Sequence, residues 1–389
     1  MSKPTFHIPS MEEIRALPWN GFTVASTFSG CGGSSTGYRM AGFKVLYANE
    51  FVEAARRTYT ANAAPYTYVD GRDIRTVQPS DVLEACKLCV GDLDLLDGSP
   101  PCSSFSLAGS RSAGWNKQKR YSDDKVQRSD DLFYEFARLL KGIQPKTFVA
   151  ENVKGLVVGQ AKGQFLEILA ALKGCGYRVA ARVLDAQWLG VPQARQRLIF
   201  IGTRNDLGID PVHPKPLPFN YTIRDALPWL AGVGTNKGVV AADRPCPTIL
   251  THGNRFTQSE RTAIDAPPVE PECDITRFAI GKEWDKMGRP GTQSEKYFQL
   301  VRPSLDAACP TITATAGISG AAGVTHPTER RKFSIAELKR LCGFPNDFQL
   351  LGTYRQQWER CGRAVPPMMM CHIAAAVRDA VLKRISNDN

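Results

Sequence analysis

Residues 22–43 read FTVASTFSGCGGSSTGYRMAGF, a short β-rich run that enters a glycine turn and then a helical pattern. Gly30, Gly32 and Gly33 let the backbone turn sharply and let a ligand approach closely. A glycine turn between a strand and a helix usually indicates a nucleotide site. The spacing is not that of the dinucleotide motif G-x-G-x-x-G, and no lysine follows as in a phosphate-binding loop. The stretch therefore predicts a strand–loop–helix unit for a ligand without a pyrophosphate.

Six further strands are predicted downstream, at residues 43–50, 66–74, 93–97, 146–152, 177–186 and 197–204. Helical patterns lie between several of them, for example at residues 131–141 and 163–173. Strands that alternate with helices predict an α/β fold with a doubly wound, mostly parallel sheet. The candidate functional residues stand at the carboxyl ends of strands, where such sheets bind ligands.

Two acidic residues stand at the carboxyl ends of the second and third predicted strands. Glu50 stands where a carboxylate can hold the two hydroxyls of a ribose, and Asp73 can accept from an exocyclic amine. Each acid alone is more often a solvated charge. In register with the glycine loop they favour a nucleoside ligand, and S-adenosylmethionine fits that description.

Residues 98–106, GSPPCSSFS, place Cys102 after a strand end and two prolines. A free cysteine is most often a small buried apolar group. Here the prolines fix the approach to the thiol, and a long polar, basic loop follows it. A nucleophilic thiol needs this kind of pre-organisation and nearby positive charge. Cys102 is therefore a candidate nucleophile.

The chain becomes rich in Pro, Gly and Thr after residue 210. Residues 243–253 and 301–317 both contain Pro-Thr-Ile, followed shortly by Thr and then Gly. We expect a second, smaller and irregular domain at residues 211–328, between catalytic segments 1–210 and 329–389. Ser334 and Glu337 predict a capping box at the start of a helix, and an amphipathic helix that begins with prolines closes the chain.

The charge balance favours a polyanionic partner. Lys and Arg number 49 against 38 Asp and Glu, which gives a formal charge of +11. No stretch approaches the ~20 apolar residues of a membrane span, and the N-terminus lacks the apolar core of a secretory signal. The 11 scattered cysteines suit a reduced, intracellular setting. Cys86 and Cys89 form a lone C-x-x-C, for which a buried thiol is favoured over a metal or redox role, and no metal is predicted.

Six motifs together resemble the cytosine-5 DNA methyltransferases of the bacterial and phage type. They are TFSGCGGSSTGYRMAGF, GSPPCSSFS, AENVKGL, VPQARQRLIFIG, RKFSIAELKRLCGFP and GRAVPP, in the order and spacing of that family. The resemblance runs from about Phe22 to Arg378. It implies a class I S-adenosylmethionine-dependent methyltransferase domain, and it places the family's variable target-recognition domain at residues 211–328.

The resemblance implies a reaction and the residues that carry it out. A methyl group would pass from S-adenosylmethionine to carbon 5 of a flipped-out cytosine, after the Cys102 thiolate adds to carbon 6. Glu151 would engage ring nitrogen 3 and the exocyclic amine, Arg195 would contact the cytosine carbonyl, and Arg197 would help order the site. The implied cofactor pocket comprises Phe28, Gly30, Cys31, Gly33, Glu50, Phe51, Asp73, Ile74, Pro100, Leu132 and Val365. The candidates for DNA contact are Ser103, Gln193, Arg195, Thr248, Thr251, Arg255, Thr311 and Thr313, with Thr315 beside them.

One position departs from the family pattern. The last motif usually reads Gly-Asn-Ala-Val-Pro-Pro, and Arg363 stands in place of the asparagine. A cation there could oppose the sulfonium of the cofactor, or it could point outward. The alternative to an active enzyme is therefore a catalytically weak or inactive DNA-binding protein on the same scaffold. RNA methylation on a related scaffold is a further, disfavoured alternative.

The resemblance also sets expectations about partners and place. Few residues precede the first motif, which favours a compact enzyme. We expect a monomer that acts on double-stranded DNA without membrane association. A cognate restriction endonuclease as a genetic partner and a solitary methyltransferase are both left open by the sequence. The protein would be located in the bacterial cytoplasm, and it would associate with the nucleoid when it is bound to DNA.

Overall fold

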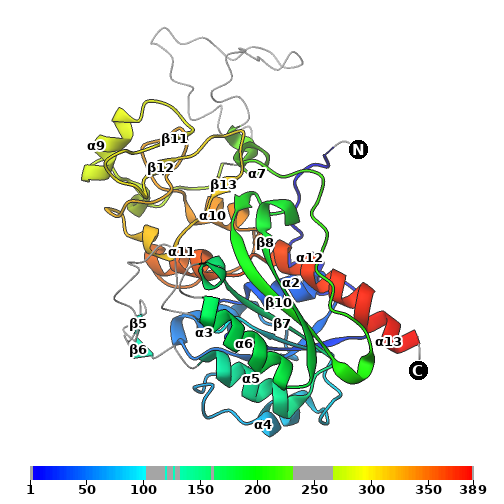
Figure 1. The fold of residues 1–389 in the computed structure, drawn as a ribbon. Helices are drawn as coiled ribbons and strands as arrows, with labels where there is room; N and C mark the ends of the chain where they lie inside the picture. The colour runs from blue at the N-terminus through cyan, green and yellow to red at the C-terminus, as the bar shows by residue number, and fades with distance from the viewer. Residues whose placement is uncertain are drawn as a thin grey trace.

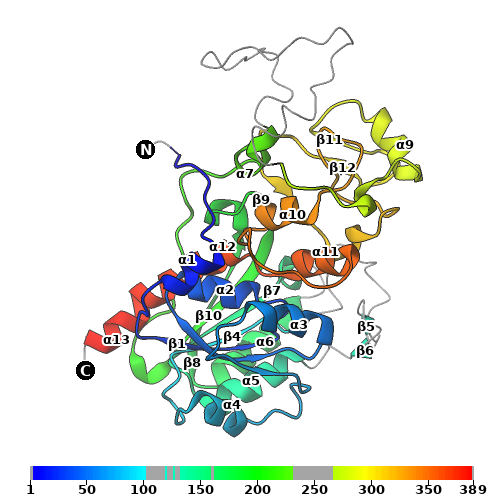
Figure 2. The ribbon, with the colours of Figure 1, turned by 180° about the vertical axis from the view of Figure 1, so that it is seen from behind.

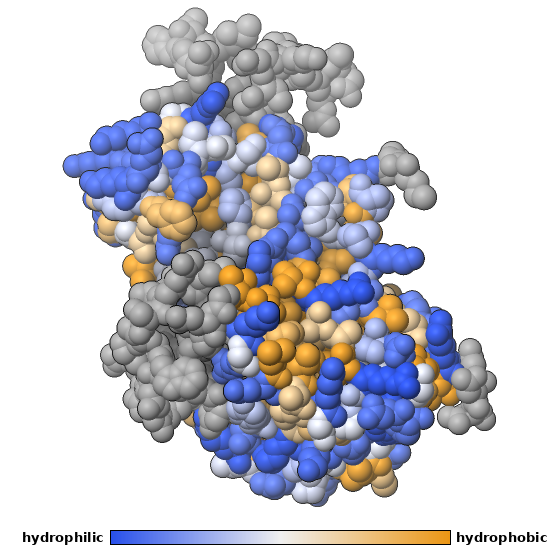
Figure 3. Space-filling view, viewed as in Figure 1, coloured by the Kyte–Doolittle hydropathy of each residue, from blue (hydrophilic) through white to orange (hydrophobic). Residues whose placement is uncertain are grey.

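The computed structural model describes residues 3–101, 119–120, 126–127, 132–158, 162–230 and 266–387. Several residues of the predicted site lie outside these ranges, namely Cys102, Ser103, Thr248, Thr251 and Arg255. Figures 1 and 2 show a lower body built around a sheet, with an upper part above it, and Figure 3 shows the surface of both parts from the side of Figure 1.

The lower body contains a seven-stranded sheet in the order β3-β2-β1-β4-β7-β10-β8. Its strands are β1 (Thr23–Thr27), β2 (Lys44–Asn49), β3 (Tyr68–Asp70), β4 (Leu95–Gly98), β7 (Thr147–Val153), β8 (Tyr177–Asp185) and β10 (Gln196–Arg204). Neighbours from β3 to β7 run parallel, whereas β10 runs antiparallel to both β7 and β8. The predicted mostly parallel sheet is confirmed. The third strand is shorter than predicted because the chain turns after Asp70, whose Oδ1 accepts from the Arg72 N–H at 2.9 Å.

Helices cover both faces of this sheet, as a doubly wound fold requires (Figures 1 and 2). Successive strand residues point to opposite faces. Val24 and Leu95 pack with the helices α2 (Gly33–Met40) and α12 (Pro367–Val377). Ala25 and Leu96 pack instead with the other layer, which is formed by α4 (Pro79–Cys86), α5 (Leu132–Ile143) and α6 (Lys162–Gly174). The helices α5 and α6 confirm the two predicted helical segments to within two residues at each described end.

Short elements complete the body. They are α1 (Met11–Ala16), α3 (Glu53–Asn62), β5 (Lys119–Arg120), β6 (Val126–Gln127), η1 (Lys154–Val157), η3 (Ala186–Leu189), β9 (Gln193–Ala194) and η4 (Asn205–Leu207), and α12 continues through η8 (Arg378–Leu382) into α13 (Lys383–Asn387).

The contact between α2 and α12 is very close because glycines stand on the facing side of α2. A Cβ atom on Gly33 would lie 2.3 Å from the Val365 carbonyl oxygen, and one on Gly37 would lie 2.4 Å from the Pro367 carbonyl oxygen. No side chain fits at these distances, so the two glycines let the last helical segment pack directly on the first.

The upper part contains short elements and little regular sheet. Its elements are α7 (Ile223–Ala226), η5 (Pro228–Leu230), η6 (Pro271–Cys273), α9 (Ala279–Lys286), β11 (Thr292–Gln293), β12 (Val301–Arg302), β13 (Cys309–Pro310) and η7 (Ala314–Gly317). A small core of its own includes Trp284 and Leu300. Ile223 and Ile312 instead share a larger core with α10 (Ile335–Leu341) and α11 (Tyr354–Arg363). The division at residues 210/211 and 328/329 stays a prediction.

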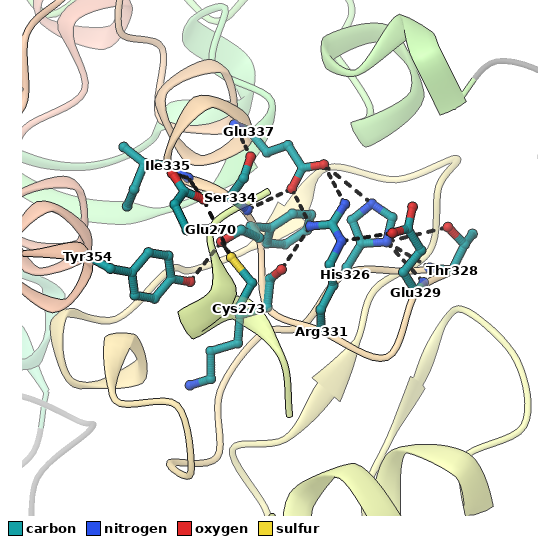
Figure 4. A network of polar contacts seen from close by, with 12 residues as sticks. Glu270, Cys273, His326, Thr328, Glu329, Arg331, Ser334, Ile335, Glu337 and Tyr354 are labelled. Atoms are coloured by element: carbon teal, nitrogen blue, oxygen red, sulfur yellow. Dashed lines mark hydrogen bonds and ion pairs between the residues drawn. The ribbon is translucent and has the colours of Figure 1, made fainter. Parts of the chain in front are cut away.

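A buried polar network fastens the end of the upper part to α10 (Figure 4). The Arg331 guanidinium donates to both carboxylate oxygens of Glu337, at 2.7 and 2.8 Å, and Glu337 is 1% exposed. Glu337 also forms the capping box with Ser334, which confirms that prediction. His326 Nε2 lies 3.6 Å from Glu337 Oε1. The Glu337 carboxylate therefore connects Arg331, Ser334 and His326.

One helical run among the described residues, Tyr354–Ser386, is long and apolar enough to cross a membrane by length and composition. More than half of its most apolar window, 56%, is buried inside the molecule, where α12 packs on α2 and the sheet. This packing is that of a core helix.

A buried carboxyl group joins the centre of the sheet to α2. Asp97, at the end of β4, accepts from Ser26 Oγ at 2.8 Å and from the Tyr38 hydroxyl at 3.1 Å. Burial raises the pKa of Asp97 to about 7, and the nearby Glu151 charge acts in the same direction, while the two hydroxyl groups oppose the rise. Asp97 therefore favours its protonated form more strongly in the folded chain than in the unfolded one.

We predict that Gly37→Ala destabilises the protein by about 1–3 kcal/mol, because the new methyl group overlaps backbone at Pro367. The matched control is Gly163→Ala in α6, where a Cβ meets nothing within 4 Å. That change should be neutral or stabilising by about 0.4–1 kcal/mol. Thermal unfolding midpoints of the two variants measure both effects, and equal shifts would show that the α2–α12 contact is not tight.

We predict that Asp97→Asn removes a pH dependence of stability. A carboxyl group whose pKa is raised in the folded state stabilises it at low pH, and this contribution is lost as pH rises from about 4 to about 7. Relative to the parent, the variant should gain about 2–4 kcal/mol over that range. Unfolding midpoints at pH 4, 5, 6, 7 and 8 test this, and a difference that stays constant with pH would contradict it.

Candidate active site

A cavity of about 1120 Å³ opens at the carboxyl ends of β1, β2, β4 and β7, below the upper part. Its lining includes most of the predicted cofactor residues, namely Phe28, Gly30, Cys31, Gly33, Glu50, Phe51, Ile74, Pro100 and Val365. It also includes the predicted catalytic residues Glu151, Arg195 and Arg197. Asp73 does not line it and pairs with Arg75 at 3.2 Å. Leu132 is fully buried in the core beneath the sheet.

The loop after β1 is held in an unusual backbone conformation. Gly30 and Gly32 have φ angles of 56° and 96°, in the left-handed region that glycine adopts freely. Phe28 also has a positive φ, 52°, which is uncommon for a residue with a side chain. The Ser29 N–H donates to the Asn49 carbonyl oxygen at 2.9 Å and ties this loop to the end of β2. Such strained positions gather at ligand sites.

Glu50 is built into the same loop. Its carboxylate accepts from the Gly30 N–H at 2.8 Å and from the Val52 N–H at 2.6 Å. Burial raises the pKa of Glu50, while these two N–H groups and the nearby Arg360 act in the opposite direction. The carboxylate thus has partners on two sides and still lines the cavity, as a group that accepts from ligand hydroxyls should.

Glu151 and Arg197 form an ion pair on the cavity wall. In the antiparallel pairing of β7 and β10, Glu151 stands opposite Ile199, so Arg197 is its diagonal neighbour on the same face. Arg197 Nε lies 2.8 Å from Glu151 Oε1, and the two side chains are 15% and 12% exposed. The arginine thereby fixes the orientation of the carboxyl group toward the cavity.

Arg195 lies deeper in the same wall. It is 2% exposed, and its Nη1 donates to the Ile312 carbonyl oxygen at 3.4 Å. Its buried Nε has no hydrogen-bond partner among the described residues. Burial lowers the pKa of Arg195 to about 9, and the neighbouring Arg197 charge acts in the same direction. A buried guanidinium with an unused donor is suited to bind an acceptor that enters the cavity.

The second Pro-Thr-Ile segment of the sequence lies directly beside this arginine. β13 pairs in parallel with β9, so that Cys309 stands opposite Gln193. Thr311 Oγ1 donates to the Ala194 carbonyl oxygen at 2.6 Å. Thr311, Thr313 and Thr315 all line the cavity. Gln193 is fully buried and donates to Cys342 Sγ at 3.2 Å, so a DNA contact by its side chain stays a prediction.

The two residues that precede position 102 belong to the cavity wall. Pro100 and Pro101 both line it, and the Asn152 amide donates to the Pro100 carbonyl oxygen at 3.3 Å. Cys102 itself lies outside the described residues.

Two arginines of α11, Arg360 and Arg363, extend the predicted site. Arg360 is 3% exposed and stands near Glu50 and Cys31, and no motif in the sequence singles it out. Arg363, the departure from the family pattern, also lines the cavity. Its Nε lies 2.7 Å from Glu359 Oε1, one helical turn earlier, and the two side chains are 32% and 9% exposed. In the sequence, the i, i+4 spacing of Glu359 and Arg363 is sufficient to predict this ion pair if the segment is a helix.

The lone C-x-x-C motif has no metal-site geometry in the described part of the chain. Cys86 is buried in the core beside α5, where burial raises its pKa to about 12, and Cys89 is exposed. Within the described ranges no three His, Cys, Asp or Glu side chains gather as metal ligands would.

Curated proteins of similar sequence are type II methyltransferases. M.NgoPII of Neisseria gonorrhoeae is 28% identical over 373 residues, which cover 95% of this chain and 98% of that protein. M.DdeI of Desulfomicrobium norvegicum is also 28% identical, with 91% of this chain and 88% of that protein covered.

Solved structures share the fold. A prophage-encoded E. coli chain described as a DNA modification methyltransferase matches with a TM-score of 0.66 at 21% identity, covering 93% of this chain and 100% of that one. A mutant of DNMT2 from Spodoptera frugiperda matches with a TM-score of 0.61 at 15% identity, covering 92% and 100%. The model of the C-5 cytosine-specific DNA methylases matches residues 22–379. The chain therefore belongs to that family, whose members transfer a methyl group from S-adenosylmethionine to carbon 5 of cytosine in DNA.

Proposed function

We propose that this methyltransferase acts on a specific site in double-stranded DNA, through a covalent adduct between Cys102 and a cytosine extruded from the duplex. The observation that carries the proposal is the shared cavity. Glu151, Arg195 and Arg197 line it together with the strained glycine loop, and so do Pro100 and Pro101, the two residues before Cys102 in the sequence.

The chemistry requires a nucleophile because carbon 5 of cytosine is itself unreactive. The Cys102 thiolate adds to carbon 6, and the electron pair of the 5,6 double bond then makes carbon 5 nucleophilic. Carbon 5 would then bond to the methyl group of S-adenosylmethionine, while the sulfur–methyl bond breaks and its electron pair leaves with S-adenosylhomocysteine. A base then removes the proton from carbon 5, and the carbon–sulfur bond breaks to restore the thiolate and the double bond.

Three charged side chains would hold the base during this reaction. Glu151, oriented by Arg197, is placed to bind ring nitrogen 3 and the exocyclic amine. Arg195, with its buried Nε, is placed to donate to the cytosine carbonyl. Hydrogen bonds at these atoms stabilise the charge that develops in the ring when the thiolate adds.

The residues of the glycine loop fit the cofactor. The Glu50 carboxylate stands at the end of β2 to accept from ribose hydroxyls, and Phe28, Phe51 and Ile74 offer apolar surface for a base. The close packing of Gly33 against Val365 closes one side of the site. We assign Asp73 and Leu132 to more distant positions around it.

The partners follow from the family and the charge. The formal charge of +11 suits a DNA duplex. The relatives named type II methyltransferases support a cognate restriction endonuclease. We propose a cytoplasmic monomer that associates with the nucleoid when it is bound to DNA, with residues 211–328 as the target-recognition domain. The candidate DNA contacts are Ser103, in the catalytic part, and Thr248, Thr251, Arg255, Thr311 and Thr313, in the proposed recognition domain.

The alternative of an inactive scaffold rested on Arg363. The ion pair with Glu359 places a carboxylate against the Arg363 charge, so that the cofactor need not meet an uncompensated cation. This pair favours the active enzyme.

We predict that Glu359→Gln weakens binding of S-adenosylmethionine by about three- to tenfold, because the Arg363 charge then opposes the sulfonium. S-adenosylhomocysteine, which has no sulfonium, should lose less. The double variant Glu359→Gln, Arg363→Asn removes both charges and should bind S-adenosylmethionine nearly as the parent does. Calorimetric titration measures all six affinities. Equal losses for both ligands, or no recovery in the double variant, would show that Arg363 does not act on the cofactor through its charge.

We predict that Cys102→Ser lowers methyl transfer about a thousandfold or more while DNA binding persists. The assay is transfer of a radiolabelled methyl group to duplex DNA and to RNA, with bisulfite sequencing of the methylated DNA to identify the target. The matched control is Cys89→Ser, an exposed thiol away from the cavity, which should keep parental activity.

The covalent step has its own readout. DNA with 5-fluorocytosine at the target should trap a complex that survives denaturing electrophoresis, because fluorine cannot leave as a proton does. The parent and Cys89→Ser should form the complex, and Cys102→Ser should not. Near-parental turnover of Cys102→Ser would contradict the covalent route, and transfer to RNA alone would contradict the DNA substrate.

A further inference from the structure

Phe298 is the most exposed large apolar side chain in the described part of the molecule. It is 82% exposed, whereas the next such residue, Val90, is 61% exposed. A single exposed apolar residue is common on protein surfaces and is not informative by itself. Phe298, however, also lines the cavity that contains Glu151 and Arg197. It therefore stands at the mouth of the active site.

The turn that presents Phe298 is firmly built. It joins β11 to β12, which pair antiparallel, and the Ser294 N–H donates to the Leu300 carbonyl oxygen at 3.0 Å. Ser294 Oγ accepts from the N–H groups of Lys296 and Tyr297, at 3.1 and 3.0 Å. The turn therefore has a defined conformation up to the residue before Phe298.

The same turn is anchored to α9 and to the small core of the upper part. Ser294 Oγ donates to Glu283 Oε1 of α9 at 2.8 Å. Leu300 is fully buried against Trp284. The Arg302 guanidinium lies 3.7 Å from the centre of the Trp284 ring. Buried and polar anchors on both sides of Phe298 hold its backbone in place, while its ring remains outside the core.

The position of the turn relates it to the DNA. Figures 1 and 2 show β11 and β12 in the upper part, with the catalytic sheet below, and the cavity has lining residues from both. A duplex whose cytosine enters this cavity must lie across its mouth, so the Phe298 ring would face the base stack where that cytosine was removed. An extruded base leaves a gap between the two neighbouring bases. If only water fills this gap, the stacking energy of those bases is lost.

We propose that Phe298 inserts into the duplex at the position vacated by the target cytosine and stacks on the neighbouring bases. Apolar side chains are used as wedges between base steps, and an aromatic ring stacks on any base without regard to its sequence. Phe298 is thus a positioning residue for base extrusion and touches none of the reacting atoms. The inference rests on the proposed action on double-stranded DNA.

The test compares two duplexes that carry the target mapped by bisulfite sequencing. In one, the target cytosine is paired with guanine, and in the other it faces an abasic position, which makes extrusion easier. Phe298→Ala should lower the single-turnover methylation rate on the paired duplex about tenfold or more, and on the abasic duplex less than about threefold. Phe298→Trp should retain most of the parental rate on both.

The matched control is Val269→Ala, an apolar residue of the same region that is 42% exposed and does not line the cavity. It should match the parent on both duplexes, and both alanine variants should keep the parental unfolding midpoint. A parental rate for Phe298→Ala on the paired duplex would overturn the proposal. An equal loss on both duplexes would also overturn it, because a role in folding or cofactor binding does not depend on base pairing.

A second readout separates this inference from the proposed function. 2-Aminopurine at the target position becomes brighter when it leaves the stack, and this signal does not require methyl transfer. The signal should be strong with the parent and weak with Phe298→Ala. Equal signals with the two proteins would overturn the insertion. Failure of the parent to methylate any duplex would instead contradict the proposed function.

Discussion

The site depends on the contact between two glycines of α2 and the backbone that precedes and begins α12. Gly33 and Gly37 leave no room for side chains against Val365 and Pro367. The contact places residues 364–371 against α2, directly after the loop that follows β1. One wall of the cavity can therefore contain Gly30 and Val365, which are more than three hundred residues apart in the sequence. A larger residue at either glycine would separate the cofactor loop from α11 and α12, and the cavity would lose that wall.

Around this contact, the charges of the cavity are arranged in compensating groups. Glu50 accepts from two backbone N–H groups, Glu151 pairs with Arg197, and Arg363 pairs with Glu359. Arg195 differs, because burial and a neighbouring cation both act against its charge. Such a guanidinium is stabilised strongly by a new acceptor, because that acceptor gives the buried Nε–H of Arg195 a hydrogen-bond partner. The proposed contact with the cytosine carbonyl thus involves the cavity charge that burial destabilises most, the guanidinium of Arg195.

The sequence predicted those parts of the fold and site that depend on local patterns. Short β-rich and apolar runs located the strands, the glycines located the loop before α2, and Ser334 with Glu337 located the start of α10. It did not predict features set by distant packing. The antiparallel direction of β10 and the pairing of β13 with β9 are examples, because no local signal encodes a partner strand. The Glu359–Arg363 pair had a signal in its spacing, but its position on the cavity depends on the packing of α11.

The pairing of β13 with β9 would link the proposed recognition domain to the proposed base-binding residues. Residues 309–313, within the predicted target-recognition domain, contact the backbone beside Arg195: Thr311 donates to Ala194, and Arg195 donates to Ile312. A shift of this segment on DNA would move the acceptor that holds Arg195. Directly after the same region, the chain is fixed to α10 by the bonds of Arg331 to Glu337. Because the following chain is fixed and residues 309–313 are bonded to Arg195 and its neighbour, a change in this segment would be transmitted to the cavity wall that contains Arg195. A correct DNA contact can thus contribute to catalysis, in addition to affinity.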